Sequence, residues 1–278
     1  MADKTLIAAH TGDWGANANW DPVNVPVNAD NVFLENSANA ITGTLNQTAV
    51  TLGNLDALAS WTGNIGSGAG SLIISAARFL YRGAGGSCYW ASGTAATSLL
   101  VVDSANVAAN AFVLSAGTVT KAVLLRGNCT LQAGGTQTTV VVGYDGVAVA
   151  DLIADLSGTN ATVYLLGGAV TLRNSPTVAV INLGATLTWV DTAGTCPLYQ
   201  QYGGTCLWNP AAAAVLTKGE IYAGPFTSGT RAGTKTITNL DVHPGATADL
   251  RNRCTLTNGP KNYGGTIQYP PGYTVVIS

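Results

Sequence analysis

The chain has 278 residues, of which 47% are hydrophobic and only 9% charged, and its formal net charge is −2. This length and apolar content allow a sizeable core, in one domain or two smaller ones, and exclude a disordered chain. The 12 Lys and Arg residues form no basic cluster, so we expect no nucleic-acid partner. The longest apolar stretch, residues 140–154, is interrupted by Asp145, Gly146 and Asp151, so we expect no membrane partner.

The first residues do not resemble a secretory signal. Asp3 comes early and the apolar stretch at residues 6–9 stops at His10, whereas a signal needs a basic start and about 7–15 apolar residues. We therefore expect the protein to be made in a cytoplasm. Its Gly-, Ala-, Thr- and Asn-rich body is nevertheless typical of surface and virion β-proteins.

Short runs of β-forming residues recur along the chain, and apolar residues at helical spacing are scarce. Gly, Asn, Asp or Ser stands in nearly every gap between these runs, which indicates many short strands joined by tight turns. The expected strands include residues 99–102, 123–125, 139–142, 163–166, 178–181 and 186–189.

A glycine followed by a short alternating strand forms a loose internal repeat. From Gly168 onwards its members lie about 15 to 26 residues apart, the range of one turn of a solenoid, and stacked turns bury a core that one turn cannot bury alone. We predict an all-β, elongated parallel β-helix, with tandem β-sandwiches as the alternative. The repeat glycines are Gly117, Gly168, Gly184, Gly204, Gly219 and Gly245.

Composition divides the chain into three parts. Residues 1–60 carry aromatic residues and proline-containing turns, and we expect them to form an N-terminal arm and cap. Residues 61–258 are the expected solenoid body. Residues 259–278 are a turn-rich C-terminal segment whose last strand, residues 274–277, needs a pairing partner from the last turn or from a symmetric oligomer.

A distinctive pattern occupies the N-terminal part: Gly12-Asp13-Trp14, Asn19-Trp20, Val25-Pro26 and Asp30-Asn31-Val32-Phe33. It resembles the opening of a group of β-solenoid proteins found in tailed phages and as repetitive bacterial surface proteins. The resemblance implies that the Trp rings cover the apolar end of the solenoid, while Pro and Asp fix the turns. The phage members are virion structural proteins, and the bacterial surface members carry export signals.

The resemblance implies a non-enzymatic phage virion protein, made in the host cytoplasm. We expect a capsid decoration (cement) protein, a homotrimer that binds the major capsid protein and stabilises the assembled shell by mass action. Residues 1–35 are the expected capsid-contacting arm, and we expect removal of residues 1–11 to abolish particle binding without unfolding the solenoid. The expected contact residues are Trp14, Trp20, Pro26 and Phe33.

A second class of function is a tail fibre or tailspike component that binds host surface glycans. Aromatic side chains on an exposed face would serve either glycan stacking or subunit contacts, and subunit contacts are favoured because Tyr and Trp are enriched at interfaces. The candidates are Trp189, Tyr199, Tyr202, Trp208, Tyr269 and Tyr273, with the Tyr89-Trp90 pair as a further one.

A third class is a polysaccharide-degrading enzyme. Glycoside hydrolysis needs two carboxylates about 5–10 Å apart, and the candidates are Asp145, Asp151, Asp155 and Glu220. The chain has only one further Glu, Glu35, and the sequence shows no cluster of Asp with Arg or Lys of the kind that uronic-acid lyases use. Turn capping by Asp is therefore favoured, and we expect no enzymatic activity.

Cysteine and histidine spacing gives no metal motif. Five cysteines are widely spaced without a C-x-x-C pair, which indicates buried thiols, with a Cys196–Cys206 pair as the alternative. His10 and His243 lack ligand spacing, so we expect no metal and no cofactor. The cysteines are Cys88, Cys129, Cys196, Cys206 and Cys254.

Overall fold

The computed structural model describes residues 1–190, 193–252 and 254–269. These residues are nearly all β, without an α-helix, and form a parallel β-solenoid of about 11 turns. The prediction of a parallel β-helix is confirmed, rather than the alternative of tandem β-sandwiches. The strand expected at residues 274–277 lies outside the described residues.

The chain divides into two compact units. Unit 1 comprises residues 1–138 and 150–154, and unit 2 comprises residues 139–149 and 155–278. These boundaries do not coincide with those expected from composition, at residues 60 and 258. Strand β9 (Leu152–Leu156) contributes residues to both units.

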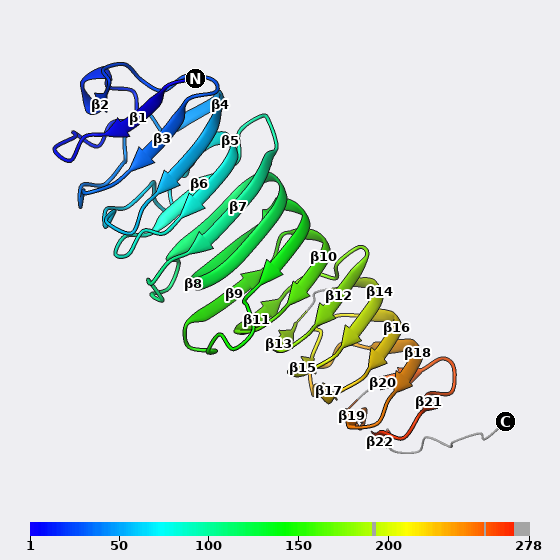
Figure 1. Ribbon diagram of the computed structural model, residues 1–278. Coiled ribbons are helices and arrows are strands. Elements are labelled where there is room, and N and C mark those ends of the chain that lie inside the picture. The colour runs from blue at the N-terminus through cyan, green and yellow to red at the C-terminus, as the bar shows by residue number, and fades with distance from the viewer. Residues whose placement is uncertain (191–192, 253, 270–278) are drawn as a thin grey trace. The chain divides into compact units, whose positions relative to one another are not determined.

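Unit 1 is built from strands that pair in parallel from one turn to the next. Its elements are β1 (Asp3–Leu6), the 3-10 turn η1 (Asn17–Asn19), β2 (Trp20–Asp21), β3 (Asn31–Leu34), β4 (Asn46–Ala57), β5 (Leu72–Tyr81), β6 (Cys88–Ala91), β7 (Thr97–Asp103) and most of β8 (Phe112–Val142). Figure 1 shows β3, β4, β5 and β7 side by side in this order.

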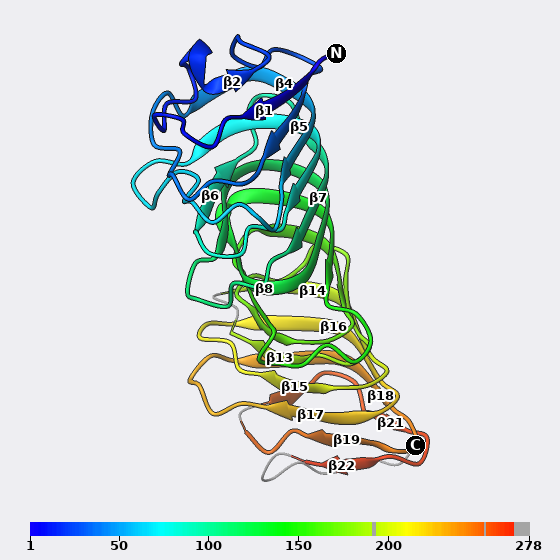
Figure 2. The ribbon, with the colours of Figure 1, turned by 60° about the vertical axis from the view of Figure 1, so that its left-hand side comes forward.

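Unit 2 contains two parallel ladders. The first runs through β10 (Thr159–Leu165), β12 (Ala179–Asn182), β14 (Gly194–Gln201), β16 (Ala214–Ile221) and β18 (Lys235–Val242) to β20 (Cys254–Leu256) and β21 (Lys261–Asn262). The second, visible in Figure 2, runs through β11 (Ala169–Leu172), β13 (Thr186–Trp189), β15 (Thr205–Trp208), β17 (Gly224–Ser228), β19 (Ala246–Asp249) and β22 (Thr266–Gln268).

Alternation along each strand separates the core from the surface. In β16, Leu216 and Ile221 are buried, whereas Lys218 and Glu220 remain partly exposed. Parallel, in-register pairing places like positions of successive turns on each other, so that Leu216 lies opposite Ile237 of β18. Each turn therefore adds one layer to a continuous apolar core.

Glycine allows the chain to bend between strands of one turn. Gly117 has φ +94° inside β8, where the strand passes from its pairing with β6 to its pairing with β7. Positive φ is readily accessible only without a Cβ atom. The prediction for one repeat glycine is wrong. Gly219 lies within β16, and the bend comes at Gly224 (φ +76°), at the start of β17.

Candidate functional site

The four residues expected to contact a capsid belong mainly to the interior of the first turns. Trp14 and Trp20 are buried and pack edge to face, with ring centroids 4.9 Å apart, and the Trp20 indole N–H donates to the Trp14 carbonyl (2.9 Å). Pro26 is also buried, and Phe33 is half-buried. We expected these four side chains to be exposed for contact with a capsid. This expectation is corrected, because the side chains cover the end of the core.

The expected N-terminal arm is folded into the solenoid. Strand β1 pairs in parallel with β3 and antiparallel with β2. The Asp30 carboxylate accepts hydrogen bonds from the backbone N–H groups of Ala2 (2.8 Å) and Val27 (3.2 Å). Partial burial favours a higher pKa for Asp30, but these donors outweigh it and the pKa is lowered. Removing residues 1–11 would therefore take away a paired strand, not a free arm.

The expected exposed aromatic face is also corrected. Trp189, Tyr199 and Trp208 are at most 1% exposed. They occupy inward positions of β13, β14 and β15. Tyr199 and Trp208 pack against Phe226, and Trp189 packs against Tyr199 and Trp208. The Tyr199 hydroxyl donates to the side-chain oxygen of Gln201 (2.8 Å), which satisfies it inside the core. Side chains alternate between the two faces of each strand, and these large rings lie at the positions that face the interior.

The remaining members of that set have different positions. Tyr202 is 45% exposed, whereas Tyr269 is half-buried. Tyr273 lies outside the described residues. In unit 1, Trp90 is buried and Tyr89 is half-buried, so this pair does not form one exposed platform.

Unit 2 carries a different set of surface rings, the aromatic column, which consists of Tyr202, Tyr222, His243 and Tyr263. Their rings stack nearly parallel from turn to turn. The centroid distances are 4.7 Å for Tyr202 and Tyr222, 4.3 Å for Tyr222 and His243, and 4.9 Å for His243 and Tyr263. The interplanar angles are 5°, 17° and 13°.

The backbone ladder fixes the spacing of this column. Each ring follows directly after β14, β16, β18 or β21. The N–H groups of Tyr222, His243 and Tyr263 donate to carbonyls of the preceding turn at 2.8–2.9 Å, at Gln201, Ile221 and Val242 respectively. These bonds continue the parallel pairing by one residue, so the rings are held at the interstrand distance.

A local sequence pattern encodes the column. Each of its residues stands shortly before a glycine, and successive members lie about 20 residues apart, one turn of the solenoid. One turn adds a buried amide before the ring: Gln201, which directly precedes Tyr202, donates to the carbonyls of Ala223 and Pro225. The spacing of aromatic residues by one turn is the sequence signal for this site, and aromatic pairs considered one at a time do not reveal it.

A polar column runs beside the aromatic column. It consists of Gln200, Glu220, Asp241 and Lys261, which face one another in register on β14, β16, β18 and β21. The Gln200 amide donates to Glu220 (2.6 Å). Lys218 forms ion pairs with Glu220 and with Asp241, the latter at 3.8 Å. The two columns together with Lys218 are called the strip below.

Hydrogen bonding holds Glu220 as an anion. Its partial burial favours a higher pKa, but the donors from Gln200 and Lys218 outweigh this effect and lower the pKa. The side-chain contact with Glu220 raises the pKa of Lys218, and burial followed by the Glu220 charge raises the pKa of Tyr222. A general acid at neutral pH needs a raised carboxyl pKa, and Glu220 has the opposite shift.

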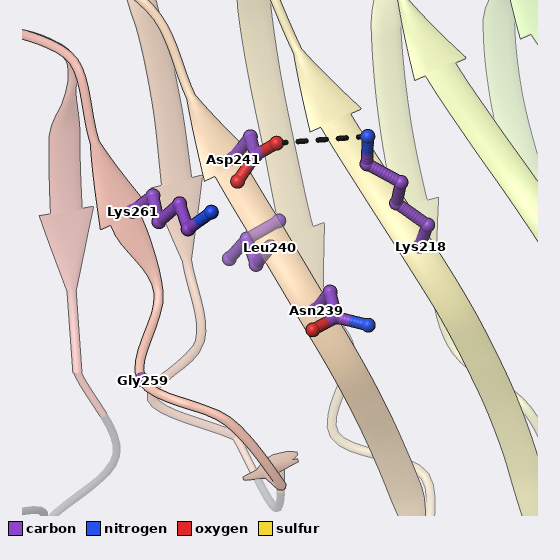
Figure 3. A pocket seen from close by; sticks show the side chains of 6 residues that line it. All are labelled: Lys218, Asn239, Leu240, Asp241, Gly259 and Lys261. Atoms are coloured by element: carbon purple, nitrogen blue, oxygen red, sulfur yellow. Dashed lines mark ion pairs between the residues drawn. The ribbon is translucent and has the colours of Figure 1, made fainter.

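An open groove of about 250 Å³ lies at the polar column, and no ring of the aromatic column lines it. In Figure 3, Lys218 and Lys261 extend towards Asp241 from the strands on either side of it. The groove therefore presents cationic donors at both sides of a carboxylate acceptor. Its lining residues are Lys218, Asn239, Leu240, Asp241, Gly259 and Lys261.

The other candidate carboxylates occupy separate surroundings. Asp145 and Asp151 are exposed. Asp155 of unit 2 accepts three hydrogen bonds of 2.7–2.9 Å from the guanidinium of Arg173. Within unit 2, this Asp155–Arg173 contact is a charge-assisted pair between neighbouring turns.

Pairing in register also creates charge clusters that the linear sequence conceals. In unit 1, Asp103 lies 3.1 Å from Arg126 and 3.6 Å from Arg82. Asp56 pairs with Arg78 at 2.6 Å, although burial outweighs this contact and raises the pKa of Asp56. These Asp and Arg residues are far apart in the sequence and become neighbours because residues one turn apart lie side by side.

All five cysteines are buried and none forms a disulfide, so the alternative of a Cys196–Cys206 disulfide is wrong. Burial raises the pKa of Cys129, Cys206 and Cys254 to about 12. Among the described residues, no three His, Cys, Asp or Glu side chains are grouped as a metal site requires. No helix within the described part of the chain is long and apolar enough to span a membrane.

The fold and the strip define a β-solenoid with an aromatic and polar surface on its second unit. No known family model, curated protein or solved structure matches this chain.

Proposed function

We propose that this chain is a non-enzymatic phage virion structural protein, a homotrimeric capsid decoration (cement) protein that binds the major capsid protein. A cement protein has to remain folded while it connects neighbouring subunits of a shell. A solenoid whose turns pair along their backbone suits this task, because each layer is supported by the next. Binding to the assembled shell then stabilises it by mass action.

The observation that carries this proposal is the role of the N-terminal pattern. The residues that resemble phage virion β-solenoids close the first turn: Trp14 packs on Trp20, and Asp30 binds two backbone N–H groups. The resemblance therefore involves the capping architecture and supports assignment to that structural class. Contact with the capsid is assigned to the solenoid surface, since the capping Trp rings are buried.

Electron cryo-microscopy of particles of the phage that encodes this chain tests the proposal. Capsid and tail are averaged separately, and an antibody raised against the purified protein labels the particles in parallel. We expect β-solenoid density at many lattice positions on the shell, in groups of three. Particles that contain the protein at neither location would contradict a virion role.

A second candidate is a tail fibre or tailspike component that binds host glycans. The strip favours it, because aromatic rings and hydrogen-bonding side chains lie together on one surface of unit 2. Density and labelling at the tail alone would support this candidate and contradict the capsid assignment.

A further inference from the structure

We propose that the strip on unit 2 binds a linear, neutral polysaccharide whose successive sugar residues cross β14, β16, β18 and β21. This inference develops the second candidate function. It concerns the purified protein, and it therefore holds or fails independently of whether the protein is located on the capsid or the tail.

The repeat distance of the strip supports a linear ligand. Neighbouring strands lie about 4.8 Å apart, and the ring centroids of the aromatic column are separated by 4.3–4.9 Å. A pyranose residue in an extended chain advances by a similar length. A chain lying along the strip therefore places successive sugars beside successive turns, where each sugar meets one ring and one polar side chain.

The polar column supports a neutral ligand. Sugar hydroxyl groups both donate and accept hydrogen bonds, and the strip provides both partners: the carboxylates of Glu220 and Asp241 accept, while Lys218, Lys261 and Gln200 donate. The two cations balance the two anions, so the strip offers no net charge to a charged polymer. The groove at Lys218, Asp241 and Lys261 gives one such site a volume of about 250 Å³.

The aromatic column contributes an apolar wall with polar ends. Because adjacent rings cover one another's faces, a sugar beside the column meets mainly ring edges and tyrosine hydroxyls. Tyr202 is 45% exposed and Tyr263 is 53% exposed. Tyrosine is suited to this role because its ring is apolar while its hydroxyl hydrogen-bonds.

Affinity electrophoresis of the full chain tests the proposal. The protein runs in native gels that contain hydroxyethyl cellulose, glucomannan or xylan, and in a gel that contains anionic alginate. We expect retardation in at least one neutral gel and none in alginate. In the retarding gel, the double variant Tyr222→Leu/Tyr263→Leu should bind at least tenfold more weakly, and Lys261→Ala should also weaken binding.

One control and one surface variant separate binding from folding. Tyr89→Leu removes a half-buried tyrosine of unit 1 and should leave the retardation unchanged. Lys261 is exposed, so Lys261→Ala tests the groove without altering the core. Wild-type mobility that is unaffected by all three neutral polymers would overturn the proposal. Retardation by alginate alone, or equal retardation of wild type and the strip variants, would also overturn it.

Discussion

At the scale of single residues, Gln137 is a buried amide without a hydrogen-bond partner among the described residues. The side chain of Gln137 is about 1% exposed, and both its amide atoms lack a partner. Leaving buried polar atoms unpaired costs about 1–3 kcal/mol. We therefore expect Gln137→Met, which keeps the volume, to raise the free energy of unfolding by about 1 kcal/mol in chemical denaturation.

Asn182 provides the matched comparison, because it is equally buried but fully bonded. Its amide donates to the carbonyls of Ala185 and Thr205 at 3.2 Å, and its oxygen accepts the N–H of Ala185 at 3.0 Å. We expect Asn182→Leu to destabilise the protein by about 2 kcal/mol. Equal effects of the two substitutions would contradict the assignment of unpaired and paired amides.

His10 makes the stability of the first turns depend on pH. Its Nδ1 atom accepts the N–H of Gly12 (3.0 Å), and its ring stacks on Trp61 with centroids 5.6 Å apart. Burial lowers the pKa of His10, so the neutral form is favoured in the folded protein. The unfolded chain therefore binds more protons near pH 6, and stability falls as the pH drops below the unfolded value of about 6.5.

Chemical denaturation at pH 7.5 and pH 5.5 measures this effect. We expect wild type to lose more stability between the two pH values than His10→Gln, which cannot titrate. Since the same carboxyl groups are present in both proteins, the difference between their pH dependences belongs to His10. Identical pH dependences would contradict the role of His10.

At the scale of elements, the bends depend on the space around their glycines. A Cβ atom at Gly117 would lie 2.5 Å from the Ser92 carbonyl oxygen, whereas one at Gly245 would meet nothing within 4 Å. Both residues have positive φ, +94° and +85°. We expect Gly117→Ala to lower the thermal stability by about 3 kcal/mol and Gly245→Ala by only about 1 kcal/mol. Calorimetry of both variants measures the two losses. Gly117→Ala combines a steric clash with the cost of a Cβ atom at positive φ, whereas Gly245→Ala has only the second cost.

The strands themselves could be predicted well, because their composition is a local property. The expected strand at residues 186–189 coincides with β13, and the expected run at residues 178–181 overlaps β12. The sequence did not predict which aromatic side chains of a strand point into the core and which point to solvent. Trp189 and Tyr202 are both flanked by β-forming and polar residues, yet the first is buried and the second exposed. Side chains alternate between the two faces of a strand, so the outcome depends on the residue at which the strand starts to pair. That residue depends in turn on the length of the bend before the strand.

The candidate site was less predictable than the fold for a related reason. Glu220 and Asp241 become neighbours only when the length of the turn between them is known. A change of one residue in that length would move a side chain from the surface to the core. The sequence contained the repeat of rings and glycines, but the pairing of β16 with β18 was needed to fix its register.

At the scale of the whole molecule, the protein is held together without disulfides. Every cysteine is buried as a thiol outside any disulfide, and the pKa of Cys129, Cys206 and Cys254 is raised to about 12 by burial. A thiol reagent reacts with the exposed thiolate. We expect no labelling of the native protein at pH 7.5 during the time in which all five thiols of the denatured protein react. Rapid native labelling, or a melting temperature that depends on reductant, would contradict this description.

The antiparallel strand β2 ends the ladder on the outer side of β1, whereas the other strands described in unit 1 pair in parallel. A turn duplicated within the parallel ladder would therefore fit between existing turns and leave β2 and β1 unchanged. Each turn copied from the region of β14 to β18 would add one ring and one polar side chain to the strip. The length of the strip is thus a trait that natural variation, or a protein engineer, can change in whole steps.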